Sequence, residues 1–323
     1  MRRPELARPP GARLALAVSA AVLVAGAALG CGSDPAPEPA PPPTRAEQRT
    51  APTQPLLPAA ADAELARIAD AAGGRLGVAV APPGGGPVEV AGDLTTGTAW
   101  STMKAPLLVA LVRSAGGWDE LSPAEQQQAA LAIERSDNEA ALALFERLAE
   151  LEGGAGAASA AIERVLRDGG DSATDVNTEP NDQGFSTFGQ TRWSAAASAS
   201  FMQALAATCL LGASDTSWVI SLMGEVVADQ RWGIGDAGYP VDDPLAFKGG
   251  WGPEPAGGYL VRQIGSVGGG AKGLVVSIIA TAPGAEPAAF AAARQLVTEA
   301  ARWIQEAVAT APSGRPAACA SAG

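Results

Sequence analysis

Apolar residues recur at helical spacing near residue 62 and then give way to short strand-like runs. The segment "DAELARIADAAG" (62–73) has the spacing of an amphipathic helix. The runs "RLGVAVA" and "PVEVAGD" come next, joined by the Gly/Pro turn "PPGGG". Such a pair of runs across a turn predicts a β-hairpin. A helix followed by two strands is therefore expected at this end.

The middle of the chain has mostly helical patterns. A strongly apolar helix is expected from Trp100 to about Ser114, and "SPAEQQQAALAIERSDNEAALALFERLAEL" predicts two helices that break near Ser136. After the polar segment "DSATDVNTEPNDQGFSTFGQT", helices are expected over about 194–207 and 215–227.

Strand patterns return towards the C-terminus. The runs "PLAFKGGWG", "GGYLVRQIGSV" and "GLVVSIIATA" are separated by Gly-rich turns, which is typical of an antiparallel meander. A long helix, "PAAFAAARQLVTEAARWIQEAVA", follows them. The predicted fold class is therefore α+β: an antiparallel sheet built from both chain ends, flanked by helices, with an all-helical subdomain inserted. Ligand sites favour the boundary between two such parts.

The N-terminal residues 1–31 have the pattern of an export signal, with four arginines before an uncharged apolar run that stops at Cys31. The tetrapeptide "ALGC" resembles a bacterial lipoprotein cleavage site, which implies that Cys31 is lipidated. The expected location is the outer face of the bacterial cytoplasmic membrane, with the lipid as anchor. An uncleaved membrane anchor and a plain signal peptide are the alternatives.

Residues 32–60 are rich in Pro and Ala and bury too little apolar surface to fold, so we expect an extended tether. The globular domain is predicted over 61–312, with a tail over 313–323. Cys209 and Cys319 suit an oxidising compartment, where they are candidates for a disulfide that pins the tail to the domain.

The charge balance and the absence of histidine exclude several classes of function. The formal net charge is −12 without a basic run, which argues against nucleic-acid binding. The chain contains no histidine, which removes Ser-His-Asp triads and His-based metal sites. We therefore expect neither a metal nor a cofactor, and a hydrolase of this sequence needs a base other than histidine.

Ser101 and Lys104 stand three residues apart at the predicted start of the apolar helix, so their side chains share one face. A buried lysine amine with a lowered pKa can take the proton of a serine hydroxyl. The alternative is an N-cap serine followed by an accidental lysine. A charge inside an otherwise apolar helix is costly without a task, which favours the catalytic interpretation.

Two further motifs are weaker when taken singly. Ser136 and Asn138 lie in "ERSDNEAALALF", where the Ser136 hydroxyl could relay a proton and the Asn138 amide could hold either a substrate amide or the lysine. Their alternative role is helix capping. Lys248 in "FKGGWG" has the charge to bind an anionic substrate, and its alternative role is that of an edge-strand lysine.

Together and in this order, the three motifs resemble those of the penicillin-recognising serine enzymes, the superfamily of penicillin-binding proteins and class A β-lactamases. Such proteins carry Ser-x-x-Lys at a helix start, Ser-Asp-Asn in a loop of the helical subdomain and Lys-Thr-Gly on a sheet strand. The resemblance covers about residues 61–310 and includes "STMK", "SDNEAALALFERL" and the closing helix. It implies a β-lactamase/transpeptidase-like fold.

The resemblance also implies roles for individual residues. Ser101 would be the acylated nucleophile and Lys104 its proton acceptor. Ser136 would relay a proton, Asn138 would contact a substrate amide, and Lys248 would help to bind a substrate carboxylate.

The expected oxyanion hole consists of the backbone N–H groups of Ser101 and Trp251. Gly249, Gly250 and Trp251 would line the substrate on the strand. These roles need no side chain on the strand other than that of the lysine.

Three departures from the family pattern limit these roles. Only 35 positions separate Ser101 from Ser136, fewer than we expect in class A enzymes, so part of the helical subdomain is missing. Gly249 replaces the hydroxyl residue of Lys-Thr-Gly, and Arg262 lies further along the next strand than the family's arginine. Carboxylate binding, and with it affinity for penicillins, is expected to be poor.

The third departure concerns the water that removes the acyl group. Class A β-lactamases use a glutamate in the motif Glu-x-x-Leu-Asn to activate this water. The segment "NTEPNDQGF" matches only part of that motif, with Glu179 as the candidate glutamate. Asp171 and Asp175 are other carboxylates nearby. The segments "FGQTRW" and "DQRWG" pair aromatic residues with arginine, and we interpret them as packing rather than as cleft rims.

The expected function is an extracytoplasmic serine hydrolase that forms an acyl-enzyme on Ser101 with β-lactam or cell-wall peptide amides. The alternatives are a non-hydrolysing, penicillin-binding-like sensor and a structural lipoprotein of the cell envelope.

Overall fold

The computed structural model describes residues 55–180, 184–255, 257–268, 273–308 and residue 319. Contacts group the chain into Met1–Pro52 and Thr53–Gly323, and only the second unit contains described residues. The predicted signal peptide with Cys31, the tether as far as residue 54 and all of the predicted tail except Cys319 lie outside the described residues.

Five antiparallel strands form one sheet in the order β2-β1-β7-β6-β5. The strands are β1 (Arg75–Ala81), β2 (Glu89–Gly92), β5 (Leu245–Pro253), β6 (Tyr259–Val267) and β7 (Leu274–Ala282). β1 from the N-terminal half pairs with β7 from the C-terminal half, so both chain ends contribute to the sheet, as predicted. β5 is an edge strand, which leaves one side of its backbone free of strand partners.

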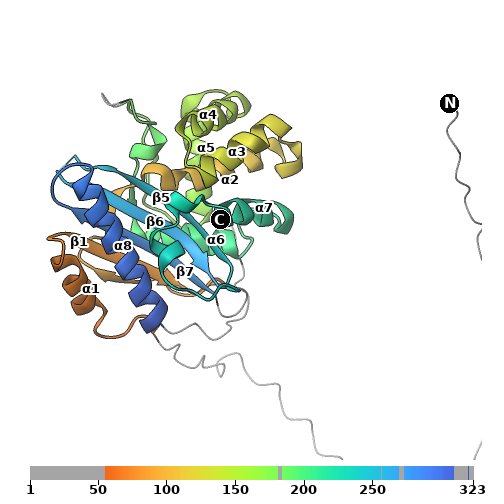
Figure 1. The fold of residues 1–323 in the computed structure, drawn as a ribbon. Helices are drawn as coiled ribbons and strands as arrows, with labels where there is room; N and C mark the ends of the chain where they lie inside the picture. Colours follow the sequence, from red (N-terminus) through yellow and green to blue (C-terminus); the bar gives the residue numbers. More distant parts are fainter. Residues whose placement is uncertain (1–54, 181–183, 256, 269–272, 309–318, 320–323) are drawn as a thin grey trace, which may run out of the picture. The chain divides into compact units, whose positions relative to one another are not determined.

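Two terminal helices cover one face of this sheet. α1 (Ala61–Asp70) and α8 (Ala288–Ala307) lie side by side on it in Figure 1. Their apolar stripes bury Leu65 and Leu296 against inward residues of the strands, such as Val78 and Ile278. The alternation of strand residues between the two faces therefore separates this core from the one beneath the opposite face.

The opposite face carries the helical part. Its members are α2 (Lys104–Ala115), α3 (Pro123–Glu134), α4 (Asn138–Glu152), α5 (Ala155–Asp168), α6 (Ala195–Ala206) and α7 (Ala213–Gly224). α6 packs on β1, β6 and β7, while α2 runs through the centre and contacts α3, α4, α5 and α7. Every residue of α2 from Lys104 to Val112 is buried, which explains why its sequence is apolar on all sides.

The helix break predicted near Ser136 is confirmed, because α3 ends at Glu134 and α4 begins at Asn138. Two features differ from the prediction. α5 is an additional helix, which buries Ala158, Ile162, Val165 and Leu166 on one face. The predicted helix at Trp100 begins instead as a 3-10 turn, η2 (Trp100–Met103), and α2 starts only at Lys104.

Short elements complete the fold. A two-stranded sheet pairs β3 (Thr96–Thr98) with β4 (Arg192–Ser194), and the remaining 3-10 turns are η3 (Trp118–Glu120), η4 (Phe188–Gln190), η5 (Ala228–Gln230) and η6 (Gly233–Asp236). The β3–β4 pair brings η4 close to η2, so the segment before β4 lies beside Ser101.

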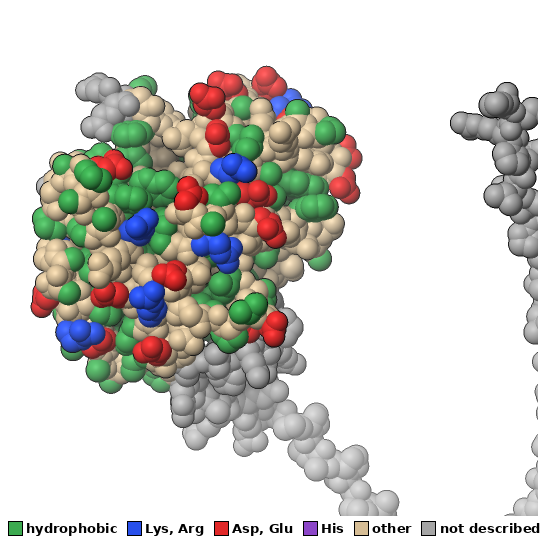
Figure 2. Space-filling model, in the orientation of Figure 1, with side chains coloured by type: hydrophobic (Ala, Val, Ile, Leu, Met, Phe, Trp, Pro, Cys, Tyr) green, Lys and Arg blue, Asp and Glu red, His purple; other side chains and the backbone are tan. Residues whose placement is uncertain are grey.

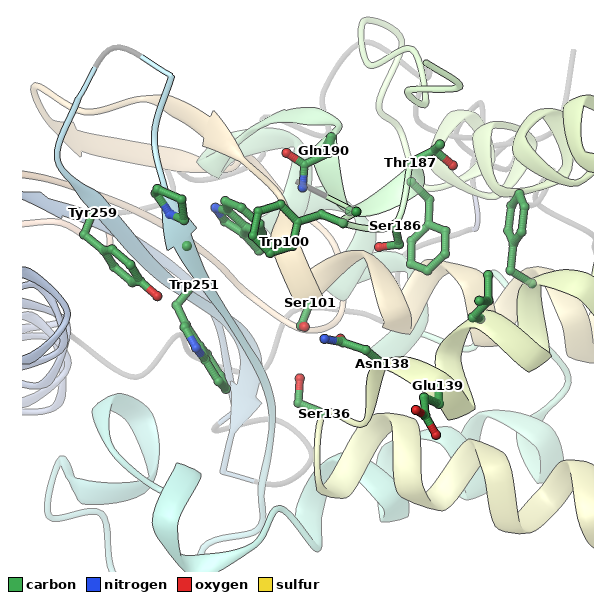
Figure 3. A pocket seen from close by; sticks show the side chains of 18 of the residues that line it. Trp100, Ser101, Ser136, Asn138, Glu139, Ser186, Thr187, Gln190, Trp251 and Tyr259 are labelled. Atoms are coloured by element: carbon green, nitrogen blue, oxygen red, sulfur yellow. The ribbon is translucent and has the colours of Figure 1, made fainter. Parts of the chain in front are cut away.

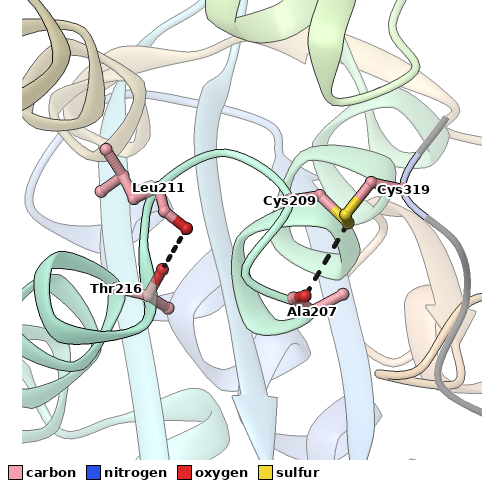
Figure 4. Close-up of a disulfide and its surroundings, with 5 residues drawn as sticks. All are labelled: Ala207, Cys209, Leu211, Thr216 and Cys319. Carbon is pink, nitrogen blue, oxygen red and sulfur yellow. Dashed lines mark hydrogen bonds between the residues drawn. A yellow bond between two sulfur atoms is a disulfide. The ribbon is translucent and has the colours of Figure 1, made fainter. Parts of the chain in front are cut away.

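The folded part starts earlier than the predicted boundary at residue 61. Leu56 is buried, and the backbone N–H groups of Leu56 and Leu57 donate to the carboxylate of Glu89 on β2. At the other end, Cys209 after α6 forms a disulfide with Cys319 (Figure 4). Among the described helices, none combines the length and the apolar composition that a membrane crossing needs.

Charged side chains of both signs are interleaved on the face that carries α8 (Figure 2). There, for example, Arg302 of α8 forms an ion pair with Asp236 of η6. Acidic side chains gather over the helical part in the same view.

Candidate active site

Ser101 lies in a cavity of about 1040 Å³ between the helical part and the edge of the sheet. The walls come from η2, the start of α4, the segment 184–190, the end of β5 and residues 284–286. Figure 3 shows the side chains of Ser101, Ser136 and Asn138 converging at its centre. Residues of the first two sequence motifs therefore meet in one site, and the strand that carries the third motif forms one of its walls.

Lys104 is buried directly behind this group, with 2% of its surface exposed. Its Nζ donates to the carbonyl oxygens of Ser136 (2.6 Å) and Asp137 (3.2 Å), to Asn138 Oδ1 (2.8 Å) and to Ser136 Oγ (3.5 Å). Burial lowers the pKa of Lys104 to about 7, and the nearby charge of Asp137 opposes that shift. The amine is therefore poised to exchange a proton near neutral pH.

Lys248 on β5 approaches the same hydroxyl from the other side. Its Nζ donates to Ser136 Oγ (2.9 Å) and to the carbonyl oxygen of Gly249 (2.9 Å). Burial, reinforced by the charge of Lys104, holds the pKa of Lys248 well below its usual value. The hydroxyl of Ser136 thus lies between two desolvated lysine amines.

In the second motif, one residue caps α4 and two others face the lysine amines. Asp137 is the N-cap of α4, where its Oδ1 accepts from the backbone N–H of Ala140 (2.8 Å). Ser136 precedes it with a positive φ of 56°, and Asn138 follows as the first helical residue. The capping alternative therefore applies to Asp137, while Ser136 and Asn138 face the lysines.

Trp100 before the candidate nucleophile also has a positive φ, of 49°. Such a conformation is uncommon for a residue with a large side chain and is typically enforced by surrounding packing. Here the Trp100 ring lies against β5, where a Cβ on Gly252 would come within 2.2 Å of it. The strand and η2 are therefore in close contact at Ser101.

The neighbouring glycines Gly249 and Gly250 lie on opposite faces of β5. A Cβ at Gly250 would lie 2.9 Å from the backbone nitrogen of Ser101, so the strand needs glycine there to approach the turn. Gly249 points the other way, and a Cβ there would lie 3.1 Å from the ring of Trp232. The missing hydroxyl at Gly249 thus makes room for a buried tryptophan, and Gly249 does not line the cavity.

The two backbone segments expected to form the oxyanion hole are adjacent, because β5 packs against η2 at Gly250 and Ser101. Trp251 lines the cavity at the edge strand, and its ring packs on Trp232 and Phe290. These contacts fix the strand backbone next to Ser101.

Arg262 faces away from the cavity, as the sequence suggested. It is fully buried beneath the sheet, where it donates to the carbonyl oxygen of Trp193 (2.9 Å) and to Ser198 Oγ (3.1 Å). Burial lowers its pKa to about 9. On the same strand Gln263, paired with Gly249, is tied to the backbone of Trp232 and Ile234. No lysine or arginine is among the described residues that line the cavity.

Glu179 does not occupy the position of a base that could activate a deacylating water. It is exposed and lies outside the cavity lining. The alternatives are engaged elsewhere, since buried Asp171 accepts from Trp193 Nε1 and Asp175 pairs with Arg167. Thr178, next to Glu179, does line the cavity, so the loop passes Ser101 without bringing the Glu179 side chain into the lining.

The "FGQTRW" segment is only partly packing. Trp193 is buried and Arg192 forms an ion pair with Glu254, in agreement with the packing interpretation. Gln190, however, lines the cavity, and its buried Nε2 has no hydrogen-bond partner in the described part of the chain. The same holds for Nε1 of Trp100. Sequence reasoning missed both donors, and the β3–β4 pairing that brings them together gives only a three-residue signal.

The second such segment, "DQRWG", is packing. Trp232 is buried against β5, and the guanidinium of Arg231 lies 5.5 Å from the centre of the Phe247 ring. In the described ranges, no group of three or more Cys, Asp and Glu side chains is arranged to hold a metal ion.

Solved structures with the same fold are class A β-lactamases and a related penicillin-binding protein. A β-lactamase from Burkholderia vietnamiensis shares 22% identity and a TM-score of 0.58, covering 77% of this chain and 98% of that one. The chromosome-encoded β-lactamase of Vibrio parahaemolyticus shares 16% identity and a TM-score of 0.58, covering 76% and 97%. PBP-A shares 18% identity and a TM-score of 0.55, covering 75% and 96%.

No protein-family model and no curated protein matches the chain. The structural likenesses establish a β-lactamase-like α+β fold. At such identities they establish the fold alone.

Proposed function

We propose that this protein is an extracytoplasmic serine hydrolase that is acylated on Ser101 by amide substrates, either β-lactams or peptides of the cell wall. The observation that carries the proposal is the Ser136 hydroxyl held between the buried amines of Lys104 and Lys248 beside Ser101. A purely structural site has no need of two desolvated lysines that lack a carboxylate partner.

The chemistry requires a neutral amine, an oxyanion hole and a proton donor. Lys104 in its neutral form takes the proton of Ser101 as Oγ attacks the carbonyl carbon, and the developing oxyanion accepts from the backbone N–H groups of Ser101 and Trp251. Collapse of the tetrahedral intermediate breaks the C–N bond. The leaving nitrogen receives its proton from Ser136 Oγ, which is replenished from Lys104.

The fate of the acyl-enzyme separates the two versions of this function. Glu179 is exposed and outside the cavity, so no carboxylate predicted from the sequence is available to activate a deacylating water. This arrangement favours a long-lived acyl-enzyme, as in a penicillin-binding sensor, over rapid turnover. Lipidation at Cys31 would hold this domain on the outer face of the cytoplasmic membrane.

Intact mass spectrometry of the full-length chain tests the proposal. The protein is exposed to a penicillin and, in parallel, to a neutral activated ester, and adducts are followed over time beside the Ser101→Ala variant. We expect an adduct that depends on Ser101 and decays over hours. Decay within seconds would indicate a β-lactamase-like hydrolase, while the absence of a Ser101-dependent adduct with every reagent would refute the proposal.

A further inference from the structure

The lining of the cavity has an unbalanced charge. Among the described residues that line the cavity, only Glu139 and Glu286 have an acidic or basic side chain, apart from Tyr259 with its phenol. Lys104 and Lys248 lie behind the wall, where their amines donate hydrogen bonds to oxygen atoms of residues 136–138 and of Gly249. A ligand in the cavity therefore meets negative charge and no opposing surface cation.

Neither carboxylate has a cationic partner in the described part of the chain. Within the described ranges, neither Glu139 nor Glu286 forms an ion pair. Glu286 Oε2 accepts from the hydroxyl of Tyr259 (3.2 Å), which keeps the carboxylate at the cavity wall. Glu139 lies in the first turn of α4, where the helix N-terminus favours an acidic residue.

The rest of the wall suits a cation and neutral carbonyl groups. Trp100, Trp251 and Tyr259 present aromatic surface to the cavity, and such rings attract cations over their faces. The N–H groups of Trp100 and Gln190, which have no hydrogen-bond partner among the described residues, are neutral donors that match amide carbonyl oxygens.

The direction of the substrate follows from the proposed proton transfer. If Ser136 protonates the leaving group, the leaving group lies on the side of Ser136 and Lys248. The acyl part then extends along β5 past Trp251, towards Tyr259 and Glu286. On the leaving-group side, Gly249 and Gln263 offer no hydroxyl or guanidinium to a carboxylate.

We propose that this site selects acyl donors with a cationic group in the acyl part and without a carboxylate beside the scissile bond. Glu286 at the acyl end of the cavity and Glu139 at the opposite wall are the carboxylates that set this preference. The inference rests on acylation of Ser101 as proposed above. The substrate class it names is a peptide-like amide or ester that carries an ammonium or guanidinium group.

A matched series of aromatic esters tests the preference. The p-nitrophenyl esters of 4-guanidinobenzoate, 4-acetamidobenzoate and terephthalate (as the monoanion) carry a cationic, a neutral and an anionic acyl group. Acylation rates of the full-length chain are measured by nitrophenolate release and divided by each ester's rate of reaction with hydroxide. We expect the cationic ester to acylate about tenfold faster than the anionic one at low salt, and the ratio to fall in 0.5 M salt.

Variants then assign the preference to the two carboxylates. In the Glu139→Gln/Glu286→Gln double variant, the ratio should fall to within about twofold. Glu146→Gln is the matched control, because it removes the same charge from α4 outside the cavity lining and should leave the ratio unchanged. The neutral ester reports in all variants whether the acylation machinery is intact.

The outcomes distinguish the two proposals. Labelling of Ser101 by the neutral ester with equal rates for cation and anion would overturn the inference and leave the proposed function standing. A ratio that persists in the double variant would also overturn it. If neither the esters nor a penicillin labels Ser101, both proposals fail together. Labelling by a penicillin but by none of the esters would overturn the inference alone, because a penicillin carries a carboxylate close to its scissile bond.

Discussion

At the scale of single residues, the amine of Lys104 is surrounded by neutral oxygen atoms. Two backbone carbonyl groups, an amide oxygen and a hydroxyl accept its hydrogen bonds, and the carboxylate of Asp137 acts on it only as a nearby charge. This environment supplies acceptors without forcing the amine to stay protonated. It is therefore suited to a base that must lose and regain a proton.

Replacement of this amine gives the first prediction. Lys104→Ala should lower acylation of Ser101 by at least about 100-fold, because a general base contributes about this much to the rate. The fold should be retained, as judged by circular dichroism and by the Cys209–Cys319 disulfide. Unchanged labelling in the folded variant would remove Lys104 from the mechanism.

The pH dependence of acylation gives the second prediction. The pKa of Lys104 is about 7, and the neutral amine is the active form, so the rate of acylation should rise as pH increases through about 7 and then level off. Stopped-flow or mass measurements from pH 5.5 to 9 with a neutral ester, whose own charge is constant, would show this. A rate that is flat after correction for hydroxide reaction would contradict a base with this pKa.

The same shift predicts how stability responds to pH. The pKa of Lys104 is lower in the folded chain than its ordinary value of 10.5, so the unfolded chain binds more protons between about 7 and 10.5. The free energy of unfolding should therefore rise with pH across this window as far as this group is concerned. Denaturant unfolding at pH 7 and 9.5 should show a smaller rise for Lys104→Ala than for the natural chain. Equal rises would contradict the lowered pKa.

At the scale of elements, the contact between β5 and η2 determines where Ser101 lies. The strand approaches the turn at Gly250, where a Cβ would come within 2.9 Å of the backbone nitrogens of Ser101 and Thr102. These atoms belong to the backbone and have little room to move. The edge of the sheet and the nucleophile are thus held by one close approach.

Gly250→Ala should disturb both stability and activity. Overpacking of this kind typically costs about 1–3 kcal/mol, and the displaced turn should lower acylation at least about tenfold. Gly156→Ala in α5 is the control for stability, because a Cβ there meets nothing within 4 Å and should stabilise the helix by up to about 1 kcal/mol. Denaturant unfolding of both variants and ester labelling of Gly250→Ala measure the effects. A fully stable and active Gly250→Ala would contradict the close approach.

Elements with a long repeating pattern could be predicted from the sequence, and elements made by tertiary contacts could not. The five strands of the main sheet and the break at Ser136 follow from alternation and capping residues. By contrast, β3 and β4 span three residues each, too few to show a period. α5 is an exception, because its buried residues Ala158, Ile162, Val165 and Leu166 do recur at helical spacing and could have been found.

The candidate site divides in the same way. Ser101, Lys104, Ser136 and Lys248 could be found because each stands in a short motif on a recognisable element. Glu179 is a candidate from its sequence position, but its side chain is exposed and outside the cavity lining, although the neighbouring Thr178 belongs to that lining. Gln190 was missed because only the β3–β4 pairing and η4 bring it to the cavity.

At the scale of the whole molecule, the site is assembled from segments far apart in sequence. Residues 100–104, 136–138 and 248–252 meet only when the inserted helices dock against the edge of a sheet that contains both chain halves. Partial unfolding of either part therefore separates Ser136 from Lys248. As the chain unfolds, acylation should therefore disappear no later than any structural signal, because the site needs all three segments in place.

The disulfide provides the last prediction, because it acts on the whole chain and not on the site. Cys209 and Cys319 are 110 residues apart, and a cross-link over a loop of this size restricts the unfolded chain strongly. Cys209→Ser/Cys319→Ser should lower the free energy of unfolding by about 2–5 kcal/mol, and a reductant should lower that of the natural chain to the same value. Acylation below the unfolding transition should be unchanged, since neither cysteine lines the cavity. Equal stability of the oxidised natural chain and the double variant would show that the cross-link does not stabilise the fold, whereas slower acylation at equal folded fraction would show that the C-terminal attachment reaches the site.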